Sequence, residues 1–122
     1  MKKILIVDDD DLFREMLQEM VTREGYTVRV ACNGQEGLEA VRSWSPDLLI
    51  TDILMPEKDG IELITELQDQ YQSLPIIAVS GGRRTISMEF NLESARLIGV
   101  RATLAKPFSR EQLRKAIEQA MD

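Results

Sequence analysis

The chain has 122 residues, of which 43% are hydrophobic and 30% are charged, and its formal net charge is −6. This composition is typical of one globular domain, and we expect a single domain over residues 1–122. The acidic balance argues against direct nucleic-acid binding, which needs massed lysines and arginines. One cysteine, Cys32, excludes an internal disulfide, and a sequence without histidine offers no zinc or thiol-imidazole chemistry.

The N-terminal apolar run is too short to cross a membrane or to act as a signal peptide, and it passes directly into aspartates. We therefore expect a cytoplasmic protein without membrane insertion. The run, Lys3 to Val7, instead predicts a buried strand of a parallel sheet. Four more apolar segments predict strands at Thr27 to Ala31, Leu48 to Thr51, Ile76 to Val79 and Ala102 to Ala105.

Helical periodicity separates these strands. Apolar residues at helical spacing predict a first helix whose methionines pack in the core: Phe13, Met16, Leu17, Met20 and Val21. The same spacing predicts a last helix from Leu113, Ala116, Ile117, Ala120 and Met121. Capping pairs place helix starts near residues 34, 60 and 110: Asn33 with Glu36, Asp59 with Glu62, and Ser109 with Gln112. A further helix is expected over roughly Ser87 to Ile98.

Five strands alternating with helices predict an α/β fold, a doubly wound parallel sheet with helices on both faces. Ligands in such sheets bind beyond the carboxyl ends of the strands, where the strand order reverses. The second strand ends in Cys32-Asn33-Gly34, without a reactive group. If it lies at the edge, in the order 2-1-3-4-5, the other four strand ends are neighbours. Those ends carry Asp8 and Asp9, Asp52, Ser80, and Lys106.

Three acids, a hydroxyl and an ammonium in one pocket are suited to phosphoryl transfer. Two carboxylates about 4 Å apart repel by roughly 4 kcal/mol at an effective dielectric constant near 20, so crowded acids call for a cation or a proton. Asp8 and Asp9 therefore suggest a hard divalent metal, and Asp52 a carboxylate nucleophile. Ser80 and Lys106 would serve as donors to phosphoryl oxygens.

Each of these residues has a simpler interpretation when it is taken alone. Asp10 and Asp11 fit the cap and the first-turn acid of the first helix, and Asp59 fits a helix N-cap. Ser80 alone reads as a turn residue, and Lys106 as a surface lysine. The joint placement of polar groups at four strand ends favours a common site over these separate explanations.

Over essentially its whole length the chain resembles the receiver domains of two-component response regulators, which have a flavodoxin-like fold. The resemblance rests on ILIVDDD at the start, then TDILMPEKDG, AVSGG and AKPFS. It implies that Asp52 is the phosphoacceptor. It also implies that Asp8, Asp9, Asp52 and the backbone carbonyl of Leu54 bind Mg²⁺, with Mn²⁺ as a possible substitute.

The same resemblance implies that Ser80 and Lys106 contact the phosphoryl group and that the Lys106-Pro107 bond is cis. The implied function is a switch with self-catalysed phosphotransfer and autodephosphorylation, rather than an enzyme. The implied donor is a sensor histidine kinase or a histidine phosphotransfer protein, and the output is an unknown downstream protein. The chain would be a monomer, or a weak dimer through the face made by the fourth helix, fifth strand and fifth helix.

Two features depart from the common pattern of that family. Thr103 stands three residues before the lysine, where the family usually carries an aromatic switch residue, so coupling through ring rotation is not available. The stretch after Ser80 is also longer than usual and contains Gly81-Gly82-Arg83-Arg84-Thr85. We hypothesise that Arg83 or Arg84 contacts the phosphoryl group or an acidic partner surface, the simpler alternative being a solvated loop.

Two other functions are considered. The chain could be a receiver domain cut from a longer transcription factor or hybrid kinase, although a free-standing regulator is favoured. It could also be a haloacid-dehalogenase-type phosphatase, in which Asp8 and Asp10 form the D-x-D motif and Asp8 is the nucleophile. Leu12 stands where that class needs a small residue, and an acidic pair after Lys106 is missing, so the receiver interpretation is preferred.

Overall fold

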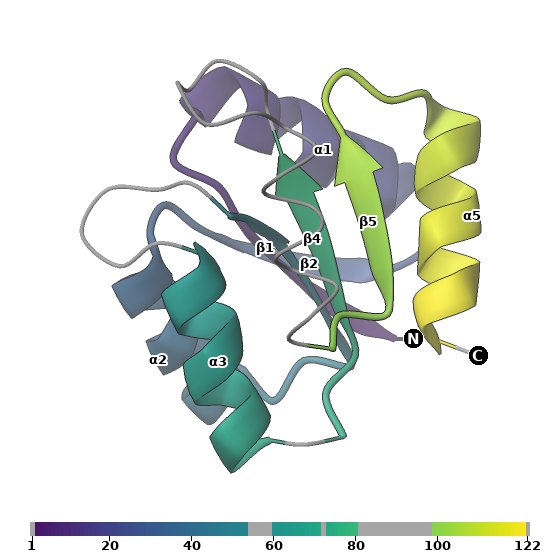
Figure 1. Ribbon diagram of the computed structural model, residues 1–122. Coiled ribbons are helices and arrows are strands. Elements are labelled where there is room, and N and C mark those ends of the chain that lie inside the picture. The colour runs from purple at the N-terminus through teal and green to yellow at the C-terminus, as the bar shows by residue number, and fades with distance from the viewer. Residues whose placement is uncertain (1, 54–59, 72, 81–98, 122) are drawn as a thin grey trace.

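The computed structural model describes residues 2–53, 60–71, 73–80 and 99–121. The strands are β1 (Lys3–Val7), β2 (Thr27–Ala31), β3 (Leu48–Asp52), β4 (Ile76–Ser80) and β5 (Ala102–Ala105). The helices are α1 (Asp11–Arg23), α2 (Gly34–Trp44), α3 (Gly60–Gln70) and α5 (Arg110–Met121). All strand pairs are parallel and the order is β2-β1-β3-β4-β5, which confirms the predicted fold class and strand order (Figure 1).

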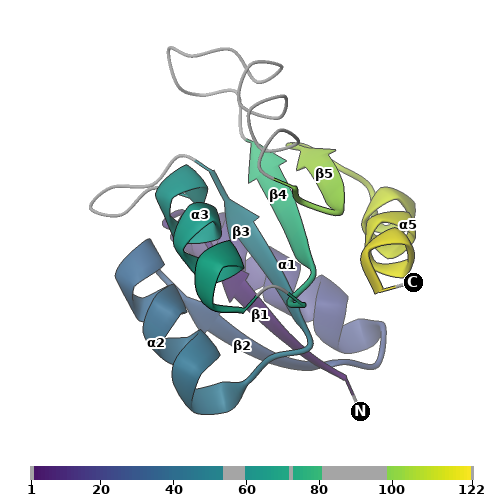
Figure 2. The same ribbon diagram turned by 60° about the horizontal axis from the view of Figure 1, so that its bottom comes forward.

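Helices cover both faces of this sheet, with α1 and α5 on one face and α2 and α3 on the other (Figure 2). Alternate residues of β1, β3 and β4 pack into the two layers: Ile4 and Ile6 of β1 pack with α1 and α5, whereas Leu5 and Val7 pack with α2 and α3. Strands β3 and β4 are buried along their whole length. Their continuous apolar sequence is therefore explained by a central position between two helical layers.

Side-chain caps begin the helices close to the predicted residues. The Asp10 carboxylate accepts a hydrogen bond from the backbone N–H of Phe13 at the start of α1, and Asn33 caps α2 in the same way. At α5 the capping box is reciprocal, because the Gln112 N–H donates to Ser109 Oγ and the Ser109 N–H donates to Gln112 Oε1. The predicted cap Asp59 and the helix expected over Ser87 to Ile98 lie outside the described residues.

The residues predicted to form the buried face of α1 are confirmed at the centre of that face, but the prediction is wrong at its edge. Leu17 and Val21 are fully buried and Met20 packs against them, but the Met16 side chain is 45% exposed. Met16 lies toward the side of the helix that the sheet does not cover, so apolar character at helical spacing overestimated the width of the buried face. No helix within the described ranges combines the length and apolar character needed to span a bilayer.

Backbone pairing fixes the carboxyl ends of the strands, where the polar residues stand. Strands β3 and β4 each run one residue beyond the predicted end and so include Asp52 and Ser80. Asp52 pairs in register with Val79, and Ser80 pairs with Ala105. Because ladder hydrogen bonds hold these residues, their side chains project from defined positions at one edge of the sheet.

Candidate functional site

Three carboxylates meet at the ends of β1 and β3. One carboxylate oxygen from each of Asp8, Asp9 and Asp52 lies within 4.8 Å of the other two. Asp8 is 1% exposed and Asp52 is 7% exposed, whereas Asp9 is half-buried at the rim. Oxygen ligands at this spacing suit a hard divalent cation such as Mg²⁺. The structure therefore brings together the three acids that the sequence placed at neighbouring strand ends.

Lys106 places an ammonium among these carboxylates. Its Nζ atom lies 2.9 Å from Asp8 Oδ2 and 3.1 Å from Asp52 Oδ2. The residue follows β5 directly, and its peptide bond to Pro107 is cis, as the resemblance implied. The side chain therefore connects the edge strand β5 with acids at the ends of β1 and β3.

Burial and charge act in opposite directions on the ionisation of these groups. Burial raises the pKa of the Asp8 carboxyl, even though hydrogen bonds from the Asp10 N–H and from Lys106 favour its ionised form. Burial lowers the pKa of Lys106, but the adjacent Asp52 and Asp8 carboxylates outweigh it and raise the pKa above its usual value. The ammonium is thus firmly charged, while Asp8 retains an energetic cost of ionisation that a bound cation would reduce.

Ser80 contributes a hydroxyl at the end of β4. It is 1% exposed, and its buried Oγ atom has no hydrogen-bond partner among the residues that the structure describes. A buried hydroxyl without a partner is costly, and such groups are uncommon in folded proteins. The hydroxyl is thus available as a donor to a group that enters beside Asp52.

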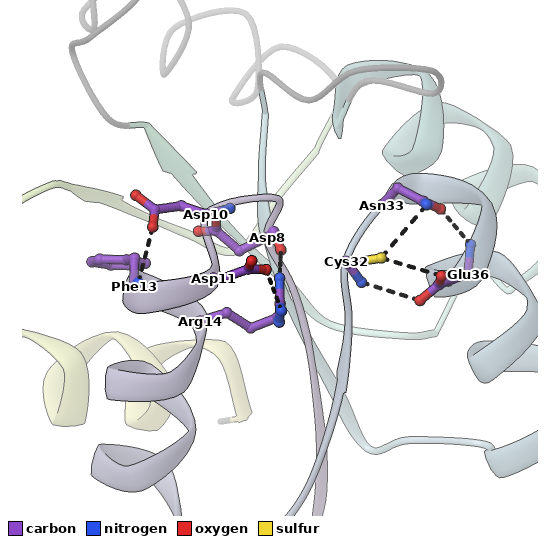
Figure 3. A network of polar contacts seen from close by, with 8 residues as sticks. All are labelled: Asp8, Asp10, Asp11, Phe13, Arg14, Cys32, Asn33 and Glu36. Carbon is purple, nitrogen blue, oxygen red and sulfur yellow. Dashed lines mark hydrogen bonds and ion pairs between the residues drawn. The ribbon is translucent and has the colours of Figure 1, made fainter.

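Asp10, Asp11 and Arg14 lie next to Asp8 at the start of α1 (Figure 3). The Asp10 N–H donates to Asp8 Oδ1 over 2.9 Å, while the Asp10 side chain caps α1. Arg14 donates to the Asp8 carbonyl over 2.8 Å and pairs with Asp11 at 2.6 Å. The helix roles predicted for Asp10 and Asp11 agree with these contacts, and a cap role for Asp10 does not favour the D-x-D phosphatase alternative.

Cys32 directly follows β2, the strand that was expected to contribute no group to the site. It is half-buried, and its thiol donates to Glu36 Oε2 over 3.2 Å (Figure 3). This hydrogen bond to Glu36, together with burial, raises the pKa of the thiol. Cys32 is therefore held in the protonated form by the first turn of α2 and is a weak nucleophile.

The comparison with known families assigns the chain to one of them. A family model described as "Response regulator receiver domain" matches residues 4–118. The chain belongs to this family. Its Asp8, Asp9, Asp52, Ser80 and Lys106 all fall within the matched residues.

Relatives and solved structures agree with this assignment. The chain is 33% identical to a probable C4-dicarboxylate response regulator, DctR, of Bacillus subtilis, over 96% of this chain and 51% of that protein. It is 36% identical to the response regulator MprA of Mycobacterium ulcerans, over 91% of this chain and 46% of that protein. The chain thus spans about half the length of the curated relatives it matches. A receiver domain protein from Clostridium thermocellum superimposes with a TM-score of 0.90 at 26% identity, covering 99% of this chain and 94% of that one.

Some positions that were assigned roles in this receiver domain lie outside the described residues. These are the Leu54 carbonyl, the two loop residues Arg83 and Arg84, and the fourth helix of the expected output face. Thr103 is described: it lies on β5, is half-buried and pairs in register with Ala78. The position thus holds a short hydroxyl side chain beside the strand that carries Ser80.

Sequence reasoning missed two residues of the receiver domain that contact the site. Arg14 holds the Asp8 carbonyl, and the ring of Phe13 lies under the Lys106 ammonium at 4.0 Å from the ring centroid. Periodicity assigned Phe13 to the core face of α1, where it does pack. An aromatic residue in the first turn after an acid cluster is the signal that could have indicated a position beside the site.

Proposed function

We propose that this receiver domain is a phosphorylation-activated signalling switch of a two-component system or phosphorelay. Asp52 accepts a phosphoryl group from a histidine kinase or a histidine phosphotransfer protein. The observation that supports this most is the Lys106 ammonium, which lies 2.9 Å from Asp8 and 3.1 Å from Asp52 at the mouth of a three-carboxylate cluster. A carboxylate nucleophile, a fixed cation and oxygen atoms that can bind a metal are the parts that phosphoryl transfer needs.

A carboxylate oxygen of Asp52 attacks phosphorus and forms the new O–P bond. The bond between phosphorus and the donor histidine nitrogen breaks, and its electron pair stays on that nitrogen. Lys106 then exchanges part of its contact with Asp52 for a phosphoryl oxygen, and the Ser80 hydroxyl donates to another. Dephosphorylation ends the signal: the oxygen of a water molecule attacks phosphorus, the bond between phosphorus and the Asp52 oxygen breaks, and its electron pair stays on the regenerated carboxylate. The product is inorganic phosphate, which keeps the protons of the water.

The acid cluster fits Mg²⁺ by the chemistry of its donors. Three carboxylates face one ammonium, so the cluster keeps an excess of negative charge, and Asp8, Asp9 and Asp52 supply hard oxygens. When bound, Mg²⁺ would supply charge neutralisation between these acids and the incoming phosphoryl group. The burial that raises the pKa of Asp8 indicates the same need for a cation.

Signalling would follow from a hydrogen bond that the Ser80 hydroxyl donates to the phosphoryl group. Ser80 Oγ is buried without a hydrogen-bond partner in the described part of the chain, so a new acceptor beside Asp52 offers it a hydrogen bond. A shift of Ser80 toward that acceptor would displace the chain that follows β4. The population of an output conformation recognised by a downstream protein would rise accordingly.

The rim of the site offers an apolar contact for a protein donor. Leu12 is 80% exposed and Met16, one turn further along α1, is 45% exposed. Leu12 follows the acid cluster directly in the sequence, so a protein that brings phosphohistidine to Asp52 must approach this turn. We expect the donor to cover Leu12 during transfer.

The proposal is tested by phosphorylation with acetyl phosphate in the presence of Mg²⁺, followed by intact-mass measurement. The wild type and Asp11→Asn should gain the mass of one phosphoryl group, because Asp11 is an exposed acid paired only with Arg14 in the described contacts. Asp52→Asn should gain none. Equal labelling of Asp52→Asn and the wild type would contradict the proposal.

A further inference from the structure

The Lys106 ammonium is enclosed by an aromatic ring as well as by carboxylates. Its Nζ atom lies 4.0 Å from the centroid of the Phe13 ring, within the range of a cation–π interaction. On its other sides it meets Asp8 Oδ2 at 2.9 Å and Asp52 Oδ2 at 3.1 Å. The ring therefore occupies one side of the cation where water or another acid could otherwise stand.

We propose that Phe13 is a positioning residue for the phosphoryl-transfer reaction, acting through Lys106. The proposal rests on the function proposed above, in which Lys106 contacts the phosphoryl group. The face of the Phe13 ring holds the ammonium near Asp52 before transfer and keeps it there after Asp52 has been modified. Phe13 does not touch the reacting atoms.

A ring suits this task better than a third acid would. Lysine ends in a compact charge on a flexible four-carbon chain, so its position depends on what surrounds it. During transfer the ammonium must exchange a carboxylate oxygen of Asp52 for a phosphoryl oxygen. A further carboxylate would compete with that phosphoryl oxygen, whereas the ring face attracts a cation over a broad area without a fixed hydrogen-bond direction.

Hydrogen bonds at the start of α1 hold the backbone of Phe13 in place. The backbone N–H of Phe13 donates to the Asp10 side chain over 3.1 Å, and the Asp10 N–H donates to Asp8 Oδ1 over 2.9 Å (Figure 3). Since Asp8 Oδ2 pairs with Lys106, these contacts close a circuit through Asp8, Asp10, Phe13 and Lys106. The acid cluster and the ring are thus placed by the same first turn of α1.

Phe108 supports the ring from the chain that carries the lysine. Its ring meets Phe13 edge to face, with centroids 5.5 Å apart and an interplanar angle of 82°. Phe13 is therefore contacted by the ammonium of Lys106 and by the ring of Phe108. Replacing Phe108 removes the edge contact but leaves the ring that faces the ammonium.

Phe13 also packs against the core, so a simple loss of stability must be separated from a role in positioning. Phe13→Leu and Phe13→Met keep apolar bulk and remove the ring, whereas Phe13→Tyr keeps it. Phe108→Leu is the control for lost packing. All variants are compared at a temperature at which thermal unfolding shows each of them to be folded, and two ring-free variants allow for one that does not fold.

The test combines nuclear magnetic resonance of the Lys106 side chain with the initial rate of Asp52 phosphorylation by acetyl phosphate at fixed Mg²⁺. In the wild type and Phe13→Tyr, the ring current should shift the Lys106 ε-methylene protons upfield. In Phe13→Leu and Phe13→Met this shift should disappear, and the rate should fall roughly threefold to tenfold. Phe108→Leu should keep both the shift and most of the rate.

An unchanged Lys106 shift in the ring-free variants, an unchanged rate, or failure of Phe13→Tyr to match the wild type would each overturn the role of Phe13. Those results would leave the proposed function standing, because the wild type would still be phosphorylated on Asp52. A wild type that takes up no phosphoryl group would instead overturn the proposed function, and the role of Phe13 with it. The Lys106 shift is measured without phosphorylation, so the two failures are distinguishable.

Discussion

The backbone N–H of Lys106 donates to the carbonyl oxygen of Ser80 over 2.8 Å. This hydrogen bond joins the last residue of β4 to the first residue after β5. The Ser80 hydroxyl and the Lys106 ammonium are therefore carried by two backbone segments that are hydrogen-bonded to each other. A displacement of Ser80 toward a phosphoryl group would therefore act directly on the segment that carries Lys106. The chain offers this route even though Thr103 replaces the aromatic switch residue.

Ser80→Ala should separate the binding role of the hydroxyl from its structural role. Its Oγ atom is buried and has no hydrogen-bond partner within the described ranges, so its removal should leave the free energy of unfolding unchanged or raise it by up to about 1 kcal/mol. The affinity for beryllofluoride, a mimic of the acyl phosphate, should fall by roughly tenfold because a donor is lost. Urea unfolding and fluorescence titration measure the two effects, and Ser80→Thr should retain tight binding.

Asp8→Asn should stabilise the metal-free protein at neutral pH. The pKa of Asp8 is raised mainly by burial, so the stability associated with this group is complete below its unfolded-state pKa of about 4 and declines as pH rises through the folded-state value. Asparagine cannot ionise and should remove that decline, with a gain of roughly 1 to 2 kcal/mol at pH 7, because the buried site no longer holds a charged Asp8 carboxylate.

The comparison for Asp8→Asn is Asp11→Asn, which removes an acid whose side chain is 84% exposed. Asp11→Asn should change the free energy of unfolding by less than about 0.5 kcal/mol at every pH. Urea unfolding between pH 4 and 8 measures both variants. A stability profile of Asp8→Asn parallel to that of the wild type would argue against burial of a charged Asp8.

Mg²⁺ should stabilise the wild type and have a much smaller effect on Asp8→Asn. A ligand that binds only the folded state adds about 2.7 kcal/mol when its concentration is a hundred times its dissociation constant. The loss of one of three carboxylates should weaken binding, so the same Mg²⁺ concentration should shift the melting temperature less. Thermal unfolding with Mg²⁺ and with a chelator checks this, and equal shifts in the two proteins would exclude Asp8 from the metal site.

Leu12→Ser should affect transfer from a protein donor and spare transfer from a small one. Leu12 is exposed at the rim, so serine should change the free energy of unfolding little. If a donor protein covers Leu12, the rate of transfer from a phosphorylated histidine kinase or phosphotransfer protein should fall several-fold, whereas the rate with acetyl phosphate should stay at the wild-type value. Equal losses with both donors would place the defect in the site rather than at the docking surface.

Glu24 connects the end of α1 to the start of α5, and Glu24→Gln should weaken that connection. Its carboxylate accepts from Arg110 at 2.7 Å and from Arg114 at 3.0 Å. Hydrogen bonds from Arg114 and then Arg110 lower the pKa of Glu24, so its stabilisation is present above the unfolded-state pKa and is lost as pH falls through the lower folded-state value.

Urea unfolding should thus show Glu24→Gln to be less stable than the wild type at pH 7, with a difference that narrows in acid. The control is Glu19→Gln, because Glu19 pairs with Arg23 on the surface of one helix with both side chains more than half exposed. That pair should contribute little. If the difference in the free energy of unfolding between Glu24→Gln and the wild type did not change with pH, the charge of Glu24 would not be its cause.

The sequence was sufficient for the sheet and for the residues at its strand ends. Apolar runs and capping pairs depend on local chemistry, so the positions of β1 and of the α2 and α5 starts could be predicted closely. The joint placement of Asp8, Asp52 and Lys106 followed from the rule that parallel strands end at one edge. The predicted ends of β3 and β4 are each one residue too early, because a polar side chain at the end of an apolar run can still belong to the strand.

Contacts that depend on side-chain direction could not be predicted in this way. Helical periodicity predicted Met16 to be in the core, because the spacing of apolar residues carries no information on how far the sheet covers the helix. It likewise identified Phe13 as a packing residue but not as the neighbour of Lys106, since that contact requires the path of the chain from β5 into α5. The Glu24 pairs with Arg110 and Arg114 join distant segments and leave no local signal.

The most direct test of the central claim is to locate the acyl phosphate in the chain. After incubation with acetyl phosphate and Mg²⁺, borohydride reduction converts a phosphorylated aspartate to homoserine, and peptide mass spectrometry locates the converted residue. We predict conversion at Asp52, with Asp8 and Asp9 unmodified. Conversion at Asp8 or Asp9, with Asp52 intact, would contradict the account.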